Sequence, residues 1–262
     1  RINIYTIGKV TQGYANFLKD KYKDQEISVA IAYDSRIKSD EFAKRAGLIF
    51  AANDIKVYLY ESLRPTPMLS FAVRELKCKG GIVITASHNP KEYNGYKVYG
   101  EDGGQLTDIL ASEVYDRICD VDIFEDINIL SEDEAISKCK LEYIGENIDR
   151  KYFDKVKELV IRKDLVKNHS HELKIVYTPL HGSGLLPVTK VLDELGYSDI
   201  KIVEEQRDPD GNFSTVPYPN PELEIVFDLP IKLAKKNDSD LILATDPDCD
   251  RVGVASKGRD GE

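Results

Sequence analysis

Short apolar runs rich in β-branched residues alternate with longer amphipathic segments along the whole chain. The short runs predict strands at 27–35, 56–60, 81–87, 173–178, 200–205, 240–245 and 251–256. The longer segments predict helices at 39–54, from the 64–67 stretch to about 79, at 144–163, at 184–196 and at 221–237, the last with a kink at Pro230. This order predicts an α/β fold made of two consecutive three-layer α/β/α domains with mixed, largely parallel sheets.

A helical and acidic stretch from 107 to 142 separates the two α/β patterns. We therefore place the domains at 1–143 and 144–262. Because the chain begins with Arg1 and stops at Glu262 just after an apolar run, we expect it to be a piece of a longer protein.

The chain is acidic, with a formal net charge of −10. This charge argues against nucleic acid or an anionic membrane as the main partner, although a local basic pocket for a small anion remains compatible with it. No apolar stretch reaches the roughly 18 residues of a membrane span, and the N-terminal segment lacks a secretory core. The four cysteines, at 78, 119, 139 and 249, form no C-x-x-C pair, so we expect reduced thiols and a cytoplasmic location.

Polar clusters follow the carboxyl ends of three predicted strands in the first half of the chain. They are Asp34-Ser35-Arg36, Arg64 to Thr66, and Ser87-His88-Asn89. Ligands of parallel sheets bind beyond this edge, so we expect a site there.

The motif "DPDCDR" follows the predicted strand 240–245 directly. In a loop, the carboxylates of Asp246, Asp248 and Asp250 can converge on one hard cation such as Mg²⁺, Ca²⁺ or Mn²⁺. Arg251 cannot bind a metal, so we place it beside an anion. The motif is not an EF-hand, because its sixth position holds Arg251 in place of glycine. An acidic surface turn is the alternative.

The motif "TASHNP" ends the third predicted strand with Ser87. A serine at the end of a strand can act as a nucleophile or phosphate carrier if a base and positive charge are near, and His88 and Lys97 are the candidates. There is no G-x-S-x-G elbow, so hydrolase chemistry has little support. A polar turn with an ordinary serine is the alternative.

Two further stretches have two interpretations each. "DPDGNF" (208–213) with "PNPE" (219–222) is typical of a structured loop. "TPLHGSG" (178–184) either binds an anion through backbone N–H groups or caps the helix that follows.

With these motifs the chain resembles the α-D-phosphohexomutases, the phosphoglucomutase/phosphomannomutase superfamily. "TASHNP" resembles the family's phosphoserine loop, "DPDCDR" its magnesium loop, and "YNGYKVYG" (93–100) the stretch that follows the serine loop. "DSR" (34–36) and "PTP" (65–67) also fit. "PTP", "TPLHGSG" and "DPDGNF" with "PNPE" are most like the longer phosphoglucomutase branch that includes phosphopentomutases.

The resemblance implies a mechanism in which phosphorylated Ser87 exchanges its phosphoryl group with a hexose phosphate through a bisphosphorylated sugar. Magnesium would be held by three aspartates and the seryl phosphate, namely Asp246, Asp248, Asp250 and Ser87. Arg251 would steady the transferring group, Arg36 would orient the serine loop, and His88 or Lys97 would serve as general acid and base.

Family members have four domains, so the resemblance implies that this chain holds most of the first and nearly all of the second, and that the 262 residues alone show little activity. Three alternatives remain open from the residues: a phosphopentomutase, a non-catalytic cation-binding module, and an aspartyl-phosphate phosphatase built on Asp246. The last fits least, because the expected D-x-D-x-[TV] order is broken at Asp250.

Overall fold

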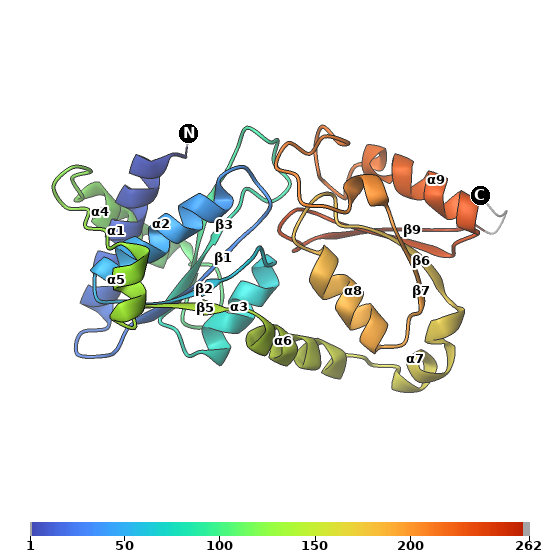
Figure 1. Ribbon diagram of the computed structural model, residues 1–262, viewed down its shortest axis with the longest axis horizontal. Helices are drawn as coiled ribbons and strands as arrows, with labels where there is room; N and C mark the ends of the chain where they lie inside the picture. Colours follow the sequence, from blue (N-terminus) through green and yellow to red (C-terminus); the bar gives the residue numbers. More distant parts are fainter. Residues whose placement is uncertain (1, 259–262) are drawn as a thin grey trace. The chain divides into compact units, whose positions relative to one another are not determined.

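The computed structural model describes residues 2–258, and the chain divides into two compact units (Figure 1). The first unit contains the residues up to Asp34, then Lys38–Ala86 and Tyr93–Gly145. The second contains Ser35–Ile37, Ser87–Glu92 and the residues from Glu146 onward. The serine loop therefore belongs to the second unit, although the strand that leads into it belongs to the first.

The first unit is built on a five-stranded sheet with the strand order β4-β3-β1-β2-β5. Its strands are β1 (Ser28–Tyr33), β2 (Lys56–Tyr60), β3 (Gly80–Ile84), β4 (Tyr96–Gly100) and β5 (Leu141–Ile144). Its helices are α1 (Ile4–Lys21), α2 (Ser39–Ala52), α3 (Thr66–Glu75), α4 (Asp108–Cys119) and α5 (Glu132–Ser137). Only β4 is antiparallel to its neighbour, as a largely parallel sheet requires.

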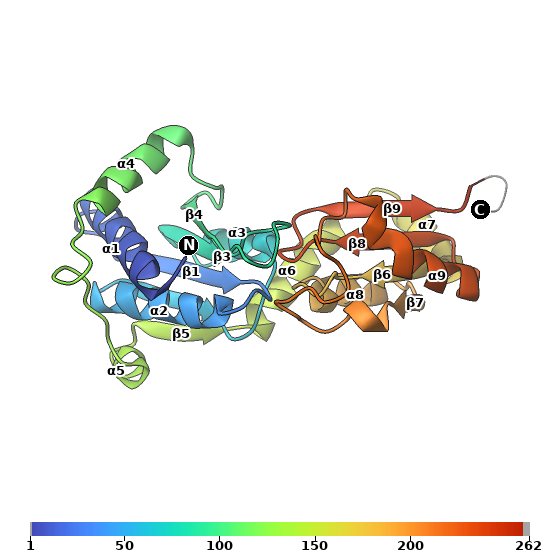
Figure 2. The ribbon, with the colours of Figure 1, turned by 90° about the horizontal axis from the view of Figure 1, so that it is seen from above.

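Helices cover both faces of this sheet. Neighbouring residues of a strand face opposite sides of the sheet. A Cβ on Gly80 would meet Tyr14 of α1, whereas one on Gly81 would meet Val73 of α3, so these two helices cover opposite faces. The main core lies on the side of α1 and α2, where the buried side chains include Ile7, Leu18, Ile31, Phe50, Val57 and Ile82. Figure 2 shows α2 and α3 on either side of β1.

The second unit is built on a four-stranded sheet with the order β7-β6-β8-β9, in which only β9 is antiparallel. Its strands are β6 (Lys174–Thr178), β7 (Asp199–Ile202), β8 (Leu241–Thr245) and β9 (Val252–Ser256). Its helices are α6 (Glu146–Glu158), α7 (Lys163–His169), α8 (Leu185–Glu194) and α9 (Asp228–Asn237). Short 3₁₀ turns lie at Ser170–Glu172, Glu204–Gln206 and Glu224–Phe227.

The second sheet is also covered on both faces. Val176 on β6 packs with Ala234 of α9. The next residue, Tyr177, faces the other way, and its hydroxyl lies 2.9 Å from the Thr245 hydroxyl, beside Gly184 at the start of α8. Figure 1 shows α9 and α8 on opposite sides of these strands. Both units are thus three-layer α/β/α structures with mixed, mostly parallel sheets, and the predicted fold class is confirmed.

Several predicted elements were wrong in detail. No helix was predicted at α1 or α7 and no strand at β4 or β5, and β5 begins within the stretch 107–142 that we expected to be helical. Only two of its four residues are buried, so its strand structure depends on pairing with β2, which a local pattern does not reveal. The predicted kink at Pro230 was also wrong. Because α9 begins at Asp228, the proline lies in the first turn, where its missing N–H costs no helical hydrogen bond.

Among the described residues, none of the helices combines the length and the apolar character needed to cross a membrane.

Candidate active site

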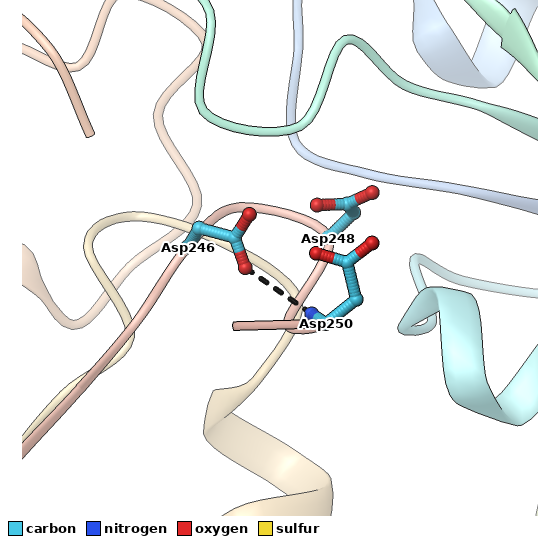
Figure 3. Close-up of side chains that lie close together, drawn as sticks. All are labelled: Asp246, Asp248 and Asp250. Carbon is cyan, nitrogen blue, oxygen red and sulfur yellow. Dashed lines mark hydrogen bonds between the residues drawn. The ribbon is translucent and has the colours of Figure 1, made fainter. Parts of the chain in front are cut away.

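The "DPDCDR" loop begins where β8 ends, at the carboxyl edge of the second sheet. One carboxylate oxygen each from Asp246, Asp248 and Asp250 can be chosen so that all three lie within 4.8 Å of one another. Figure 3 shows these three side chains lying close together. Asp246 and Asp248 are fully buried, whereas Asp250 is exposed. The loop therefore gathers three oxygen donors with one open side.

The loop is wound around Asp246 by its own backbone. The Asp246 carboxylate accepts hydrogen bonds from the amides of Asp250 and Arg251, both at 3.1 Å. Its carbonyl accepts a third from the amide of Cys249, which adopts the left-handed conformation at φ +51°. These local bonds turn the chain back on itself, so carboxylates two residues apart point to the same place.

Burial and the charges of Asp248 and Asp250 raise the pKa of Asp246 to about 8. Gathering three carboxylates, two of them buried, is costly unless a cation neutralises them. An all-oxygen set of this kind suits a hard divalent ion such as Mg²⁺, Ca²⁺ or Mn²⁺. The oxygen donors and the repulsion among the three carboxylates therefore both fit a divalent-cation site.

The "TPLHGSG" stretch supports this loop through hydrogen bonds to its backbone. Both the amide and the hydroxyl of Ser183 donate to the carbonyl of Pro247, each at 2.8 Å. The amides of His181 and Gly182 donate to other backbone carbonyls. Since these three N–H groups already have partners inside the protein, the structure favours a supporting role for them over anion binding.

Ser87 lies beside the metal loop. Its hydroxyl donates to the Asp246 carboxylate at 2.8 Å and lies 3.3 Å from Nδ1 of His88. The residue is 8% exposed and holds the left-handed conformation at φ +54°, which is uncommon for a serine. Backbone strain of this kind concentrates at functional sites, because the surroundings must hold it in place.

Arg36, which is not part of the serine loop, binds the backbone of that loop. Its guanidinium donates to three backbone carbonyls of the loop, those of Ser87 (2.6 Å), Asn89 (2.5 Å) and Pro90 (3.0 Å). Arg36 is 3% exposed, so these charge-assisted bonds form away from water. The planar guanidinium thus fixes the path of the loop that carries Ser87.

Arg251 connects the two loops through His88. Its Nη1 lies 3.4 Å from Nε2 of His88 and 3.2 Å from a carboxylate oxygen of Glu222. Burial and the charge of Arg251 lower the pKa of His88, which favours the neutral imidazole. Glu222 belongs to "PNPE", which the sequence indicated only as a turn, and no local signal points from it to Arg251.

The first unit holds the other predicted residues. Lys97 is half-buried on β4, opposite Val83, and is not among the residues that the second unit brings together. The sequence analysis also missed a role for Asp34, whose carboxylate accepts hydrogen bonds from Thr85 (2.7 Å) and Ser39 (3.0 Å). These bonds tie the end of β1 to the end of β3.

Family models match most of the chain. The phosphoglucomutase/phosphomannomutase α/β/α domain I matches residues 1–122, and domain II of the same family matches residues 150–259. The chain belongs to this family. The resemblance carried by the serine and aspartate motifs is thereby confirmed.

Similar proteins agree with this membership. A phosphoglucomutase from Staphylococcus haemolyticus (strain JCSC1435) is 41% identical over 262 residues, which is 100% of this chain and 46% of that protein. A phosphoglucomutase from Staphylococcus aureus (strain COL) is 39% identical, with the same coverage. The chain thus spans about half the length of the curated relatives it matches.

Solved structures share the fold. A Thermus thermophilus protein described as a phosphomannomutase matches with a TM-score of 0.80 at 25% identity, over 97% of this chain and 53% of that one. A phosphoglucomutase/phosphomannomutase family protein from Burkholderia thailandensis matches with a TM-score of 0.75 at 22% identity, over 100% and 52%.

Proposed function

We propose that this chain carries the phosphoryl-transfer residues of a phosphoglucomutase/phosphomannomutase, which moves a phosphoryl group between the 1- and 6-positions of a hexose phosphate. The observation that carries the proposal is the 2.8 Å hydrogen bond from the Ser87 hydroxyl to Asp246, within the three-aspartate cluster. A serine held against a cation site is suited to carry a phosphoryl group.

In the proposed reaction, phosphorylated Ser87 gives its phosphoryl group to a free sugar hydroxyl. The bond from phosphorus to the seryl Oγ breaks and a bond to the sugar oxygen forms, while the sugar hydroxyl proton passes to a base and the departing seryl oxygen takes a proton from an acid. The bisphosphorylated sugar then returns its other phosphoryl group to Ser87 by the reverse steps. Atoms and charge balance over the cycle, and no co-reactant is consumed.

Three groups of residues have separate tasks in this proposal. Arg36 holds the serine loop in place, and Arg251 lies where it can contact the transferring group. His88, whose pKa is lowered by burial and by Arg251, can accept a proton, and Lys97 is the alternative acid or base. Asp246, Asp248 and Asp250, with an oxygen of the seryl phosphate, would hold Mg²⁺. The ion would neutralise charge on the phosphoryl group.

Glucose phosphate is the substrate that the relatives favour, because the relatives at 39–41% identity are named phosphoglucomutases. They do not favour the pentose phosphate alternative or the non-catalytic cation-binding module.

The test is Ser87→Ala in the intact protein. Removing the phosphoryl carrier should abolish turnover of glucose 1-phosphate and the addition of one phosphate to the protein, measured by intact mass and mapped to Ser87. Ser137→Ala, on exposed α5, is the matched control and should retain both. Undiminished turnover in Ser87→Ala would rule out the proposed role.

A further inference from the structure

The guanidinium of Arg36, besides binding the carbonyls of the serine loop, lies over the aromatic ring of Phe213. The centre of its guanidinium is 5.0 Å from the centroid of the Phe213 ring. An arginine over an aromatic face is attracted by the ring quadrupole, and the attraction is stronger where both groups are removed from water. Arg36 and Phe213 are each 3% exposed, so this contact is of the stronger kind.

Phe213 is itself held firmly by its loop. It packs in a buried apolar cluster with Leu180, Val216 and Val226. Its amide donates to the carbonyl of Asp210 at 3.0 Å, and its φ of +48° is one that a phenylalanine rarely adopts. The surroundings therefore hold the backbone of Phe213 in an otherwise unfavourable conformation, and the apolar cluster fixes its ring.

The same loop fits closely against the segment that carries Arg36. A Cβ on Gly211 would lie 2.6 Å from the amide nitrogen of Ile37 and 3.0 Å from the carbonyl oxygen of Ser35. Only glycine allows the two backbones to approach this closely. The loop 208–214 thus contacts both the backbone and the side chain of the Arg36 segment.

We propose that Phe213 is a positioning residue for the phosphoryl-carrying serine, acting through Arg36. The ring holds the guanidinium in the orientation that lets it reach the carbonyls of Ser87, Asn89 and Pro90. The "DPDGNF" loop then has a function beyond its turn: it sets the position of Ser87. This inference rests on the proposed function, because the serine loop matters for catalysis only if Ser87 carries the phosphoryl group.

The test uses three variants of the intact protein. Phe213→Leu keeps an apolar side chain but removes the aromatic face. Phe213→Tyr keeps the face. Val226→Ala is the matched control, because it opens the same buried cluster at a residue that has no ring to offer Arg36.

Turnover separates positioning from packing. We expect Phe213→Leu to lower kcat about 10-fold with KM changed less than about twofold, since a misplaced serine affects the chemical step more than substrate binding. Phe213→Tyr should have a kcat within about twofold of that of the unmodified protein. Val226→Ala should keep its kcat even if its Tm falls as much as that of Phe213→Leu. An unchanged kcat in Phe213→Leu, or an equal loss in Val226→Ala, would overturn the proposal.

A double-mutant cycle and amide exchange complete the test. In an Arg36→Ala background, Phe213→Leu should cause no further loss of kcat, because the two residues act through one contact. Hydrogen exchange of the backbone amides of residues 87–89, 91 and 92 should be faster in Phe213→Leu than in Val226→Ala, and equal exchange would contradict the positioning role. Hydrogen exchange can be measured without turnover. If exchange is faster in Phe213→Leu but the unmodified protein has no mutase activity, the proposed function is refuted while the effect of Phe213 on the serine loop still holds.

Discussion

The two loops that meet at the candidate active site are held in place in opposite ways. The metal loop is held mainly by its own backbone, because Asp246 accepts hydrogen bonds from amides four and five residues further along, with added support at Pro247 from Ser183. The serine loop is held from a distance. Arg36, which binds its carbonyls, is 51 positions away from Ser87, and Asp246, which accepts the Ser87 hydroxyl, is 159 positions away.

This difference predicts different consequences for mutation. A self-supporting loop keeps its shape when one ligand is replaced, so a change there should remove the cation and little else. A loop held from a distance loses its shape when its holder is replaced, even if every residue of the loop is intact. The two loops can therefore be separated by measuring cation binding and turnover on the same variants.

The largest effect is expected from Asp248→Asn in the metal loop. Asp248 is the better choice because Asp246 also accepts the loop amides. The amide side chain has the same shape but no charge, so Mg²⁺ affinity should fall sharply and turnover should fall by at least about 10²-fold, as loss of several kcal/mol of charge stabilisation implies. Calorimetric Mg²⁺ titration and turnover measure both.

The Tm of Asp248→Asn without Mg²⁺ gives an independent check. Removing one of three neighbouring carboxylates relieves repulsion, so the Tm should not fall. Asp238→Asn, on an exposed ion pair with Lys257, is the control and should leave Mg²⁺ affinity unchanged. A variant that binds Mg²⁺ normally would show that Asp248 is not a ligand.

A smaller effect is expected from Arg36→Lys in the segment that holds the serine loop. A lysine cannot bridge three carbonyls or stack flat on Phe213, because its ammonium is a single point of charge. We expect kcat to fall about 10- to 10²-fold while Mg²⁺ affinity stays within about twofold of the unmodified protein. Loss of both together would mean that the two loops are not held independently, and the comparison would fail.

The same contrast explains what the sequence could predict. The alternation of apolar runs predicted both sheets, since strand and helix periods are local properties. The spacing of Asp246, Asp248 and Asp250 indicated a cation site for the same reason. β5 was missed because its strand structure depends on pairing with β2, and the kink at Pro230 was wrongly predicted because the start of α9 was misplaced.

The contacts around Ser87 could not be predicted from spacing alone. "ASHNP" describes an ordinary polar turn until Arg36 and Asp246 are placed beside it, and the partners lie far along the chain. Phe213 and Glu222 were hidden for the same reason, because each lies in a stretch whose local pattern indicates only a turn. Partners that lie far apart in the sequence can be identified only from the fold or from the family resemblance.

The smallest effect is expected from pH, through the loop that carries Phe213. Burial alone would raise the pKa of Asp210, but hydrogen bonds from the Ser214 hydroxyl and from the amides of Asn212 and Ser214 outweigh it and lower the pKa to about 2. The ionised carboxylate therefore stabilises the folded state above its unfolded pKa of about 3.9, and this contribution is lost as the pH falls toward about 2.

Urea unfolding at pH 5, 4 and 3 measures this loss. Asp210→Asn should be less stable than the unmodified protein at pH 5, by less than about 1 kcal/mol for a partly exposed group, and the difference should shrink at pH 3. Ser214→Ala removes one of the hydrogen bonds and should weaken the pH dependence without abolishing it. Mg²⁺ affinity at pH 7 should be the same in both variants, because the loop supports the serine side of the site. A constant difference from pH 5 to 3 would show that the Asp210 charge does not hold this loop.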